Sequence, residues 1–169
     1  MNLEKLIQPK HLVILAVAGQ LAASVALADE SVKDIVDIAA GSPEHTTLVT
    51  AVKAADYVQS LKNPGPLTVF APTNAAFAKL PKGTVEGLLK PESKGDLEKV
   101  LQYHVTPSVY ETKWMKDGMT LGQANGAKVT IGVKDGKYTV NGANIVASVR
   151  ASNGIVHIID AVLLPPAKK

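Results

Sequence analysis

Residues 153–165 of this chain read Asn-Gly-Ile-Val-His-Ile-Ile-Asp-Ala-Val-Leu-Leu-Pro. The Asn153-Gly154 pair is typical of a tight turn. The run from Ile155 to Leu164 is β-branched or apolar at most positions, and Asp160 carries its only charge. Such a run predicts a strand that is covered on both faces or nearly so, and Pro165 ends it.

A second stretch, residues 68–77, reads Thr-Val-Phe-Ala-Pro-Thr-Asn-Ala-Ala-Phe. Its valine and phenylalanine suit a strand, and the proline that follows ends the strand because it has no backbone N–H. The threonine or asparagine after the proline then caps a helix. The stretch therefore predicts a strand–turn–helix corner. Its expected framework residues are Phe70, Pro72, Thr73, Asn74 and Phe77.

The half of the chain before residue 104 has mostly helical periodicity. A first helix is expected after residue 31, with Ser31 as its cap and Asp34 completing a weak capping box. A second helix is expected from about residue 47, a short one over 85–89, and a longer one over 94–103.

The half after residue 104 has the pattern of a β-meander. Turn dipeptides stand at Asn125-Gly126, Asp135-Gly136 and Asn141-Gly142. Short alternating stretches between and after these turns predict strands over 128–133, 137–140 and 145–150. Helices followed by antiparallel strands indicate the α+β class.

The first 28 residues have the layout of a secretory signal peptide. Lys5 and Lys10 precede an apolar run over 12–18, and Ala26-Leu27-Ala28 forms a small-residue cleavage site. The alternative is an uncleaved membrane anchor, but the apolar run is shorter than the roughly 20 residues that a span needs. We expect cleavage to leave residues 29–169 as one domain, secreted to the periplasm or the cell exterior, with no stable membrane insertion.

The composition argues against several kinds of function. The 18 basic residues include a single arginine, which does not favour nucleic-acid binding. The three histidines after residue 28 (His45, His104 and His157) lack the spacing of a metal site, and the chain has no cysteine. No Gly-x-Ser-x-Gly elbow or Gly-rich phosphate loop occurs. We therefore expect no enzyme, no metal and no cofactor.

The two quoted stretches, with Tyr103-His104 between them, resemble the fasciclin domain family over residues 31–165. The resemblance implies a compact β-sandwich or wedge with flanking N-terminal helices. It also implies a non-enzymatic exported module for adhesion or surface binding, whose partner is a cell-surface or matrix protein or a polysaccharide. Some animal members carry an Asp-Ile pair tied to integrin binding. Ser148 and Val149 stand there in this chain, so we do not expect that activity.

Four residues are candidates for the binding surface. The resemblance implies recognition near Tyr103 and His104, although such a pair more often satisfies buried backbone groups. Tyr110 and Trp114 lie in a polar loop a few residues later. They either fold back onto the core or form an exposed contact. The alternative function, which the resemblance also implies, is carriage of an apolar small molecule such as a carotenoid or lipid.

Two polar residues in the last strand are expected to be structural. His157 alternates with Ile155 and Ile159, which is typical of a hydrogen-bonded core histidine. Asp160 has to pair with a backbone N–H or a lysine if it faces inward, because an unpaired buried charge is costly.

Overall fold

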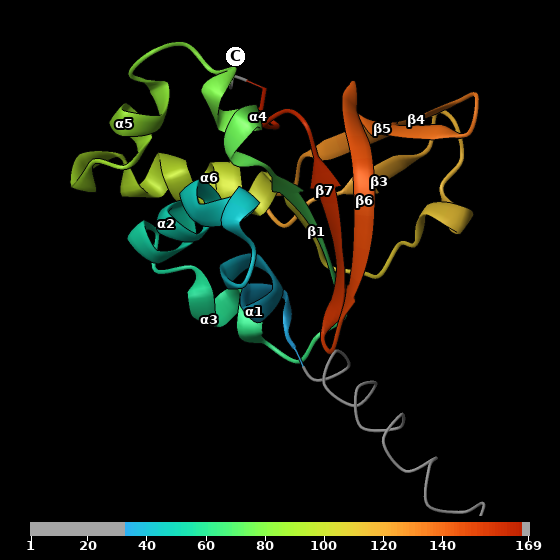
Figure 1. Cartoon of the computed structure of the whole chain (residues 1–169), viewed down its shortest axis with the longest axis horizontal. Helices are drawn as coiled ribbons and strands as arrows, with labels where there is room; N and C mark the ends of the chain where they lie inside the picture. The colour runs from blue at the N-terminus through green and yellow to red at the C-terminus, as the bar shows by residue number, and fades with distance from the viewer. Residues whose placement is uncertain (1–32, 167–169) are drawn as a thin grey trace, which may run out of the picture. The chain divides into compact units, whose positions relative to one another are not determined.

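The computed structural model describes residues 33–166 (Figure 1). The expected signal peptide over 1–28 lies outside the described residues. Within them the strands form one sheet in the order β2-β1-β7-β6-β5-β4-β3. The strands are β1 (Leu67–Pro72), β2 (Val105–Thr106), β3 (Thr120–Gly122), β4 (Lys128–Lys134), β5 (Lys137–Val140), β6 (Ala143–Ala151) and β7 (Gly154–Ile159).

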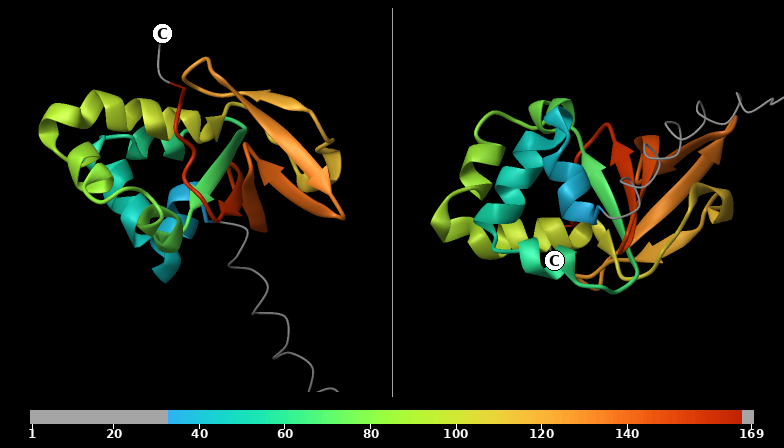
Figure 2. Two further views of the ribbon diagram at one scale, coloured as in Figure 1. Left: turned by 90° about the horizontal axis from the view of Figure 1, so that it is seen from above. Right: turned by 60° about the horizontal axis from the view of Figure 1, so that its bottom comes forward.

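The helices gather on one side of β1 and β7, while β3, β4 and β5 lie on the other side (Figures 1 and 2). The α-helices are α1 (Ile35–Ala40), α2 (Thr46–Ala54), α3 (Val58–Lys62), α4 (Asn74–Ala78), α5 (Thr84–Leu88) and α6 (Lys94–Tyr103). Three short 3₁₀ turns are η1 (Pro43–His45), η2 (Pro91–Ser93) and η3 (Thr112–Trp114). The predicted α+β class is confirmed.

The parallel pairing of β1 with β7 joins the two halves of the chain. Leu67 lies opposite Gly154, and the register continues to Pro72 opposite Ile159. A Cβ atom at position 154 would collide with the carbonyl oxygen of Leu67. Only glycine therefore lets the two strands start side by side, which is the physical reason for the Asn-Gly sequence at this turn.

Two hydrophobic clusters cover the two faces of this strand pair. One contains Val69 and Val156 with side chains of α1, α2, α3 and α6. The other contains Phe70 and Ile159 with side chains of β3, β4 and β5. Neighbouring residues of one strand thus face different clusters, as the strand period requires. The sheet folds over the second cluster, which gives the wedge that the resemblance implied.

Two sequence-based boundaries were wrong. Strand β7 ends at Ile159 and does not continue to Leu164. At the next residue the side chain replaces the backbone in the ladder, because the carboxylate of Asp160 accepts the N–H of Asn144 that its backbone oxygen would accept in a continuing strand. The first helix begins at Ile35, with Asp34 itself as the cap in place of Ser31. Asp34 and Asp37 each accept a hydrogen bond from the other's backbone N–H, which forms a capping box.

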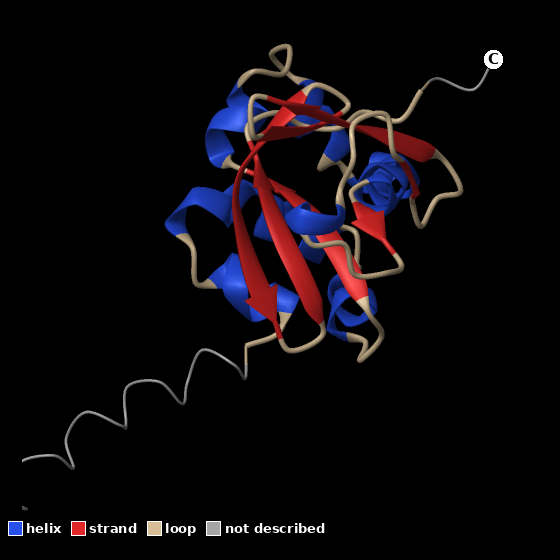
Figure 3. Cartoon of the chain, turned by 90° about the vertical axis from the view of Figure 1, so that its right-hand side faces the viewer, coloured by secondary structure: helices blue, strands red, loops and turns tan. Residues whose placement is uncertain are grey.

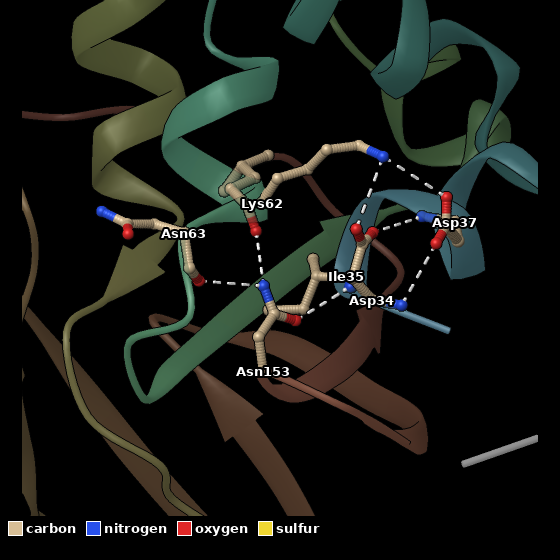
Figure 4. Close-up of polar contacts among 7 residues, drawn as sticks. Asp34, Ile35, Asp37, Lys62, Asn63 and Asn153 are labelled. Atoms are coloured by element: carbon tan, nitrogen blue, oxygen red, sulfur yellow. Dashed lines mark hydrogen bonds and ion pairs between the residues drawn. The ribbon is translucent and has the colours of Figure 1, made fainter. Parts of the chain in front are cut away.

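The side chain of Asn153 ties the β6–β7 hairpin to the helical half (Figure 4). Its Nδ2 donates to the backbone oxygens of Leu61 at 2.7 Å and Asn63 at 3.2 Å. Its Oδ1 accepts from the backbone N–H of Ile35 at 3.1 Å. One carboxamide therefore forms hydrogen bonds with backbone groups at the start of α1 and at the end of α3.

Replacing Asn153 by alanine should lower the free energy of unfolding by about 1–3 kcal/mol, because it leaves these backbone groups without their partner. Denaturant unfolding followed by circular dichroism measures the change. Asn63→Ala is the matched control, since Asn63 contributes its backbone oxygen to this cluster (Figure 4). We expect that control to stay within about 0.5 kcal/mol of the unaltered protein. Equal losses in both variants would contradict the role given to Asn153.

Candidate binding surface

Tyr103 ends helix α6 and is buried, with 3% of its surface exposed. Its hydroxyl donates to the backbone oxygen of Lys128 at 3.1 Å and accepts from Asn141 Nδ2 at 2.9 Å. The ring also belongs to the second hydrophobic cluster. Tyr103 thus fastens α6 to β4 and to the β5–β6 turn, and its ring does not reach the surface.

His104 is likewise buried, immediately after α6. Its Nδ1–H donates to the backbone oxygen of Val100 at 2.8 Å, and Nε2 accepts from the backbone N–H of Leu163 at 3.0 Å. Because Nε2 is an acceptor, the ring is neutral, and burial lowers the pKa of His104 to about 4. The Tyr103-His104 pair is therefore internal and offers no side chain for direct contact with a partner.

Tyr110 lies in the segment between β2 and η3 and is half-buried against the second cluster. Its backbone N–H donates to Thr68 Oγ1 at 2.9 Å, and its backbone oxygen lies 2.7 Å from His157 Nε2. Thr68 Oγ1 also donates to the backbone oxygen of Ser108 at 2.7 Å. Buried polar groups of β1 and β7 therefore hold this segment against the sheet.

Trp114 is the one predicted binding residue that lies well exposed, with 52% of its surface accessible. The next residue, Met115, is buried in the second cluster and anchors the turn. The Nζ of Lys113 lies 4.8 Å from the centroid of the indole ring, a cation–π contact. Of the two alternatives for this loop, exposure holds for Trp114, whereas Tyr110 packs partly on the core.

A small charge network connects this loop to β6. Glu111 pairs with Arg150 of β6, and its Oε2 lies 2.6 Å from Lys113 Nζ. Lys113 and Arg150 are exposed, so these ion pairs add little stability, but they link the loop to β6. Through the shared partner Glu111, the network brings the Lys113 ammonium near the Arg150 side chain. Sequence reasoning missed Glu111 and Arg150, because no local pattern links residues so far apart.

His157 is fully buried in β7 and stacks on Phe70 with ring centroids 5.6 Å apart. Its Nε2–H donates to the backbone oxygen of Tyr110, since a carbonyl is only an acceptor. Nδ1 then accepts from the hydroxyl of Ser148 at 2.7 Å. Burial lowers the pKa of His157 and keeps the ring neutral. The histidine joins β7, β6 and the Tyr110 segment.

Asp160 follows β7 and is partly exposed. Its carboxylate accepts from the backbone N–H and from Nδ2 of Asn144, each at 2.8 Å. These bonds lower the pKa of Asp160. Lys79 Nζ donates to the backbone oxygen of Asp160 at 2.8 Å. The aspartate thus pairs with a backbone N–H and a side-chain amide.

The remaining expected framework residues form the corner after β1. Thr73 caps α4 by accepting from the N–H of Ala76 at 3.2 Å. Asn74 Oδ1 accepts from the N–H of Thr47 at 3.0 Å, and its Nδ2 donates to the oxygen of Pro43 at 2.9 Å. The corner therefore also holds η1 and α2 in place.

Residues 33–166 contain no group of three or more His, Asp or Glu side chains placed to hold a metal ion. Within the same residues, no helix is long and apolar enough to cross a membrane.

Comparison with known proteins agrees with this fold. The family model described as Fasciclin domain matches residues 43–165, and the chain belongs to this family. It is 52% identical over 140 residues to Protein sll1483 of Synechocystis sp., covering 82% of this chain and 77% of that protein.

More distant similarities reach animal proteins. Transforming growth factor-beta-induced protein ig-h3 of Sus scrofa is 35% identical over 136 residues, which are 80% of this chain and 20% of that protein. Among solved structures, the chain is similar to a FAS1 domain pair from the insect cell adhesion molecule fasciclin I. The TM-score is 0.68 at 17% identity, covering 80% of this chain and 52% of the other.

Acid should destabilise this protein in a window set by its buried histidines. Burial lowers the pKa of His45, His104 and His157 below the ordinary 6.5, so the unfolded chain binds more protons as pH falls. Their contribution to stability is complete above pH 6.5 and is lost as pH falls from there toward 4. For His104 alone the loss is on the order of 3 kcal/mol.

Thermal melting between pH 7.5 and 4 measures this effect. The melting temperature should fall steadily below pH 6.5, and His104→Gln should show a shallower fall from a lower starting value. Asp160 contributes separately, because its lowered pKa acts only below the ordinary 3.8. A melting temperature that stays constant from pH 7.5 to 5 would contradict the internal, neutral state of these rings.

Proposed function

We propose that this protein is an exported, non-enzymatic adhesion or surface-binding module that contacts its partner through the surface around Trp114. The observation that carries the proposal is a tryptophan with 52% of its surface exposed on a loop that is otherwise fixed to the core. Tryptophan buries a large area at little rotamer cost, so it often dominates binding energy. Similarity to a cell adhesion molecule supports the same class of function.

The polar groups of the core also favour binding over catalysis. His104 and His157 have lowered pKa values, but both nitrogens of each ring are engaged in internal hydrogen bonds. A catalytic group needs a perturbed pKa together with access to substrate. These histidines have perturbed pKa values but no access to substrate, so we expect no catalytic activity from them.

The alternative of carotenoid or lipid carriage has weaker support. A cavity of about 70 Å³ lies among α1, α2, α3, β1 and β7, and its lining is apolar except for Lys53. Pockets for drug-sized ligands have volumes of roughly 300–1,000 Å³. This cavity is suited at most to a very small apolar molecule. A larger hollow of about 440 Å³ between β5 and β6 is an open groove whose lining includes the polar residues Lys137, Asn144 and Asp160. Neither suits a carotenoid or lipid well, so we do not favour a carrier function.

The single tryptophan of the chain makes the binding proposal directly testable. Intrinsic fluorescence should shift on addition of the partner, for which intact cells and isolated envelope polysaccharide of the source organism are the two separate probes. Trp114→Ala should weaken binding at least about 10-fold, a typical hot-spot loss, with little change in melting temperature.

Two further variants complete this test. Leu164→Ala is the matched control, since Leu164 is 50% exposed and lies outside the Trp114 loop. Tyr110→Ala should lower the melting temperature, because Tyr110 packs on the second cluster. If Trp114→Ala and Leu164→Ala bind equally well, the partner surface lies elsewhere.

Export also has a direct check. We expect the protein isolated from periplasm or medium to begin at Asp29, because the small residues at positions 26 and 28 mark the cleavage site. N-terminal sequencing or intact-mass measurement reads the terminus. Recovery of the chain with Met1 in the membrane fraction would contradict a secreted module.

A further inference from the structure

Strand β6 has one open edge. Residues 145–151 pair with β7 along the inner side, while β5 pairs with β6 only at Ala143 and Asn144. In an antiparallel sheet the backbone groups of a strand point alternately to its two sides. None of the loop, turn or side-chain hydrogen bonds among the described residues reaches the backbone of 145–151. On the side away from β7, Figure 3 shows no strand beside the lower part of the outermost long strand.

The splay of β5 away from β6 keeps this edge accessible. The two strands leave an open groove of about 440 Å³ where they part, lined by residues that include Tyr138, Ile145 and Val146. Val146 is 59% exposed and Val149 is 37% exposed. The edge therefore presents β-branched side chains together with unpaired backbone.

The usual protections of an edge strand are weak here. Natural edges carry charges, prolines or bulges that prevent further pairing. Residues 145–151 read Ile-Val-Ala-Ser-Val-Arg-Ala and hold one charge, Arg150, which is already paired with Glu111. One irregularity occurs between Ile145 and Ala147, and the pairing from Ala147 to Ala151 is regular. Five residues thus form a regularly paired stretch whose outer edge can accept another strand.

We propose that this edge pairs antiparallel with the same edge of a second copy of the chain, about a two-fold axis at Val149. Such an axis places Ala147 opposite Ala151 and Ser148 opposite Arg150. The two Val149 side chains meet at the axis, where β-branched pairs are favourable. Arg150 of each copy lies opposite the Ser148 hydroxyl of the other copy, so no like charges face each other. This self-complementarity favours a second copy over an unrelated strand, and the dimer does not depend on partner binding at Trp114.

Sedimentation velocity of the purified protein over a range of concentrations tests the dimer. The unaltered protein should dimerise as concentration rises. Val149→Lys sets two like charges opposite each other and should raise the dimer dissociation constant at least about 10-fold. Leu164→Lys is the matched control, because Leu164 is 50% exposed and lies outside β6, and it should leave the constant unchanged.

Cross-linking gives a second, independent measurement. The chain contains no cysteine, so Val149→Cys introduces the only thiol. Mild oxidation should convert this variant to a disulfide-linked dimer, since opposed Cβ atoms lie about 4.5–5.5 Å apart in such a pair. Leu164→Cys should not cross-link to the same extent. A protein that stays monomeric at all concentrations, or equal cross-linking of both variants, would overturn the proposal whatever Trp114 binds.

Discussion

The close approach of β1 and β7 is the constraint on which the rest of the fold depends. These strands come from distant parts of the chain, and their parallel pairing requires a position without a Cβ at Gly154, opposite Leu67. Asn153, one residue earlier, binds the ends of α1 and α3. Two adjacent residues therefore set the strand register and the position of the helices, which explains why this dipeptide is so informative in the sequence.

Buried polar residues of the core likewise hold the loop that carries Trp114 in place. Thr68 and His157 bind backbone groups of Ser108 and Tyr110 in this loop, and His104 binds the backbone N–H of Leu163 in the irregular segment after β7. Buried backbone groups need such partners, and a neutral histidine supplies one donor and one acceptor at a fixed separation. The core thus holds an irregular segment in one position. The exposed indole of Trp114 therefore projects from a segment that is fixed to the core.

The sequence predicted the parts of the fold that depend on local periodicity and turn chemistry. Helix α6 over 94–103 and strand β5 over 137–140 have the predicted bounds, because residues near in sequence determine both. The predicted end of β7 was wrong, since the strand stops where the Asp160 side chain binds the backbone N–H of Asn144, a contact between residues far apart in the sequence. The exposure of Trp114 and the Glu111–Arg150 pair could not be predicted from sequence patterns, because both depend on how the loop packs against residues far away in the sequence.

The open edge of β6 follows from the contacts of Asp160. Its carboxylate binds the backbone N–H and the amide of Asn144, and its own N–H donates to the oxygen of Asn144. This fastens the start of β6 to the chain leaving β7, next to the irregularity between Ile145 and Ala147. Such irregularities bend and twist a strand. β6 therefore turns away from β5 after two residue pairs. The same folding of the sheet that encloses the second hydrophobic cluster leaves the outer edge of β6 unpaired.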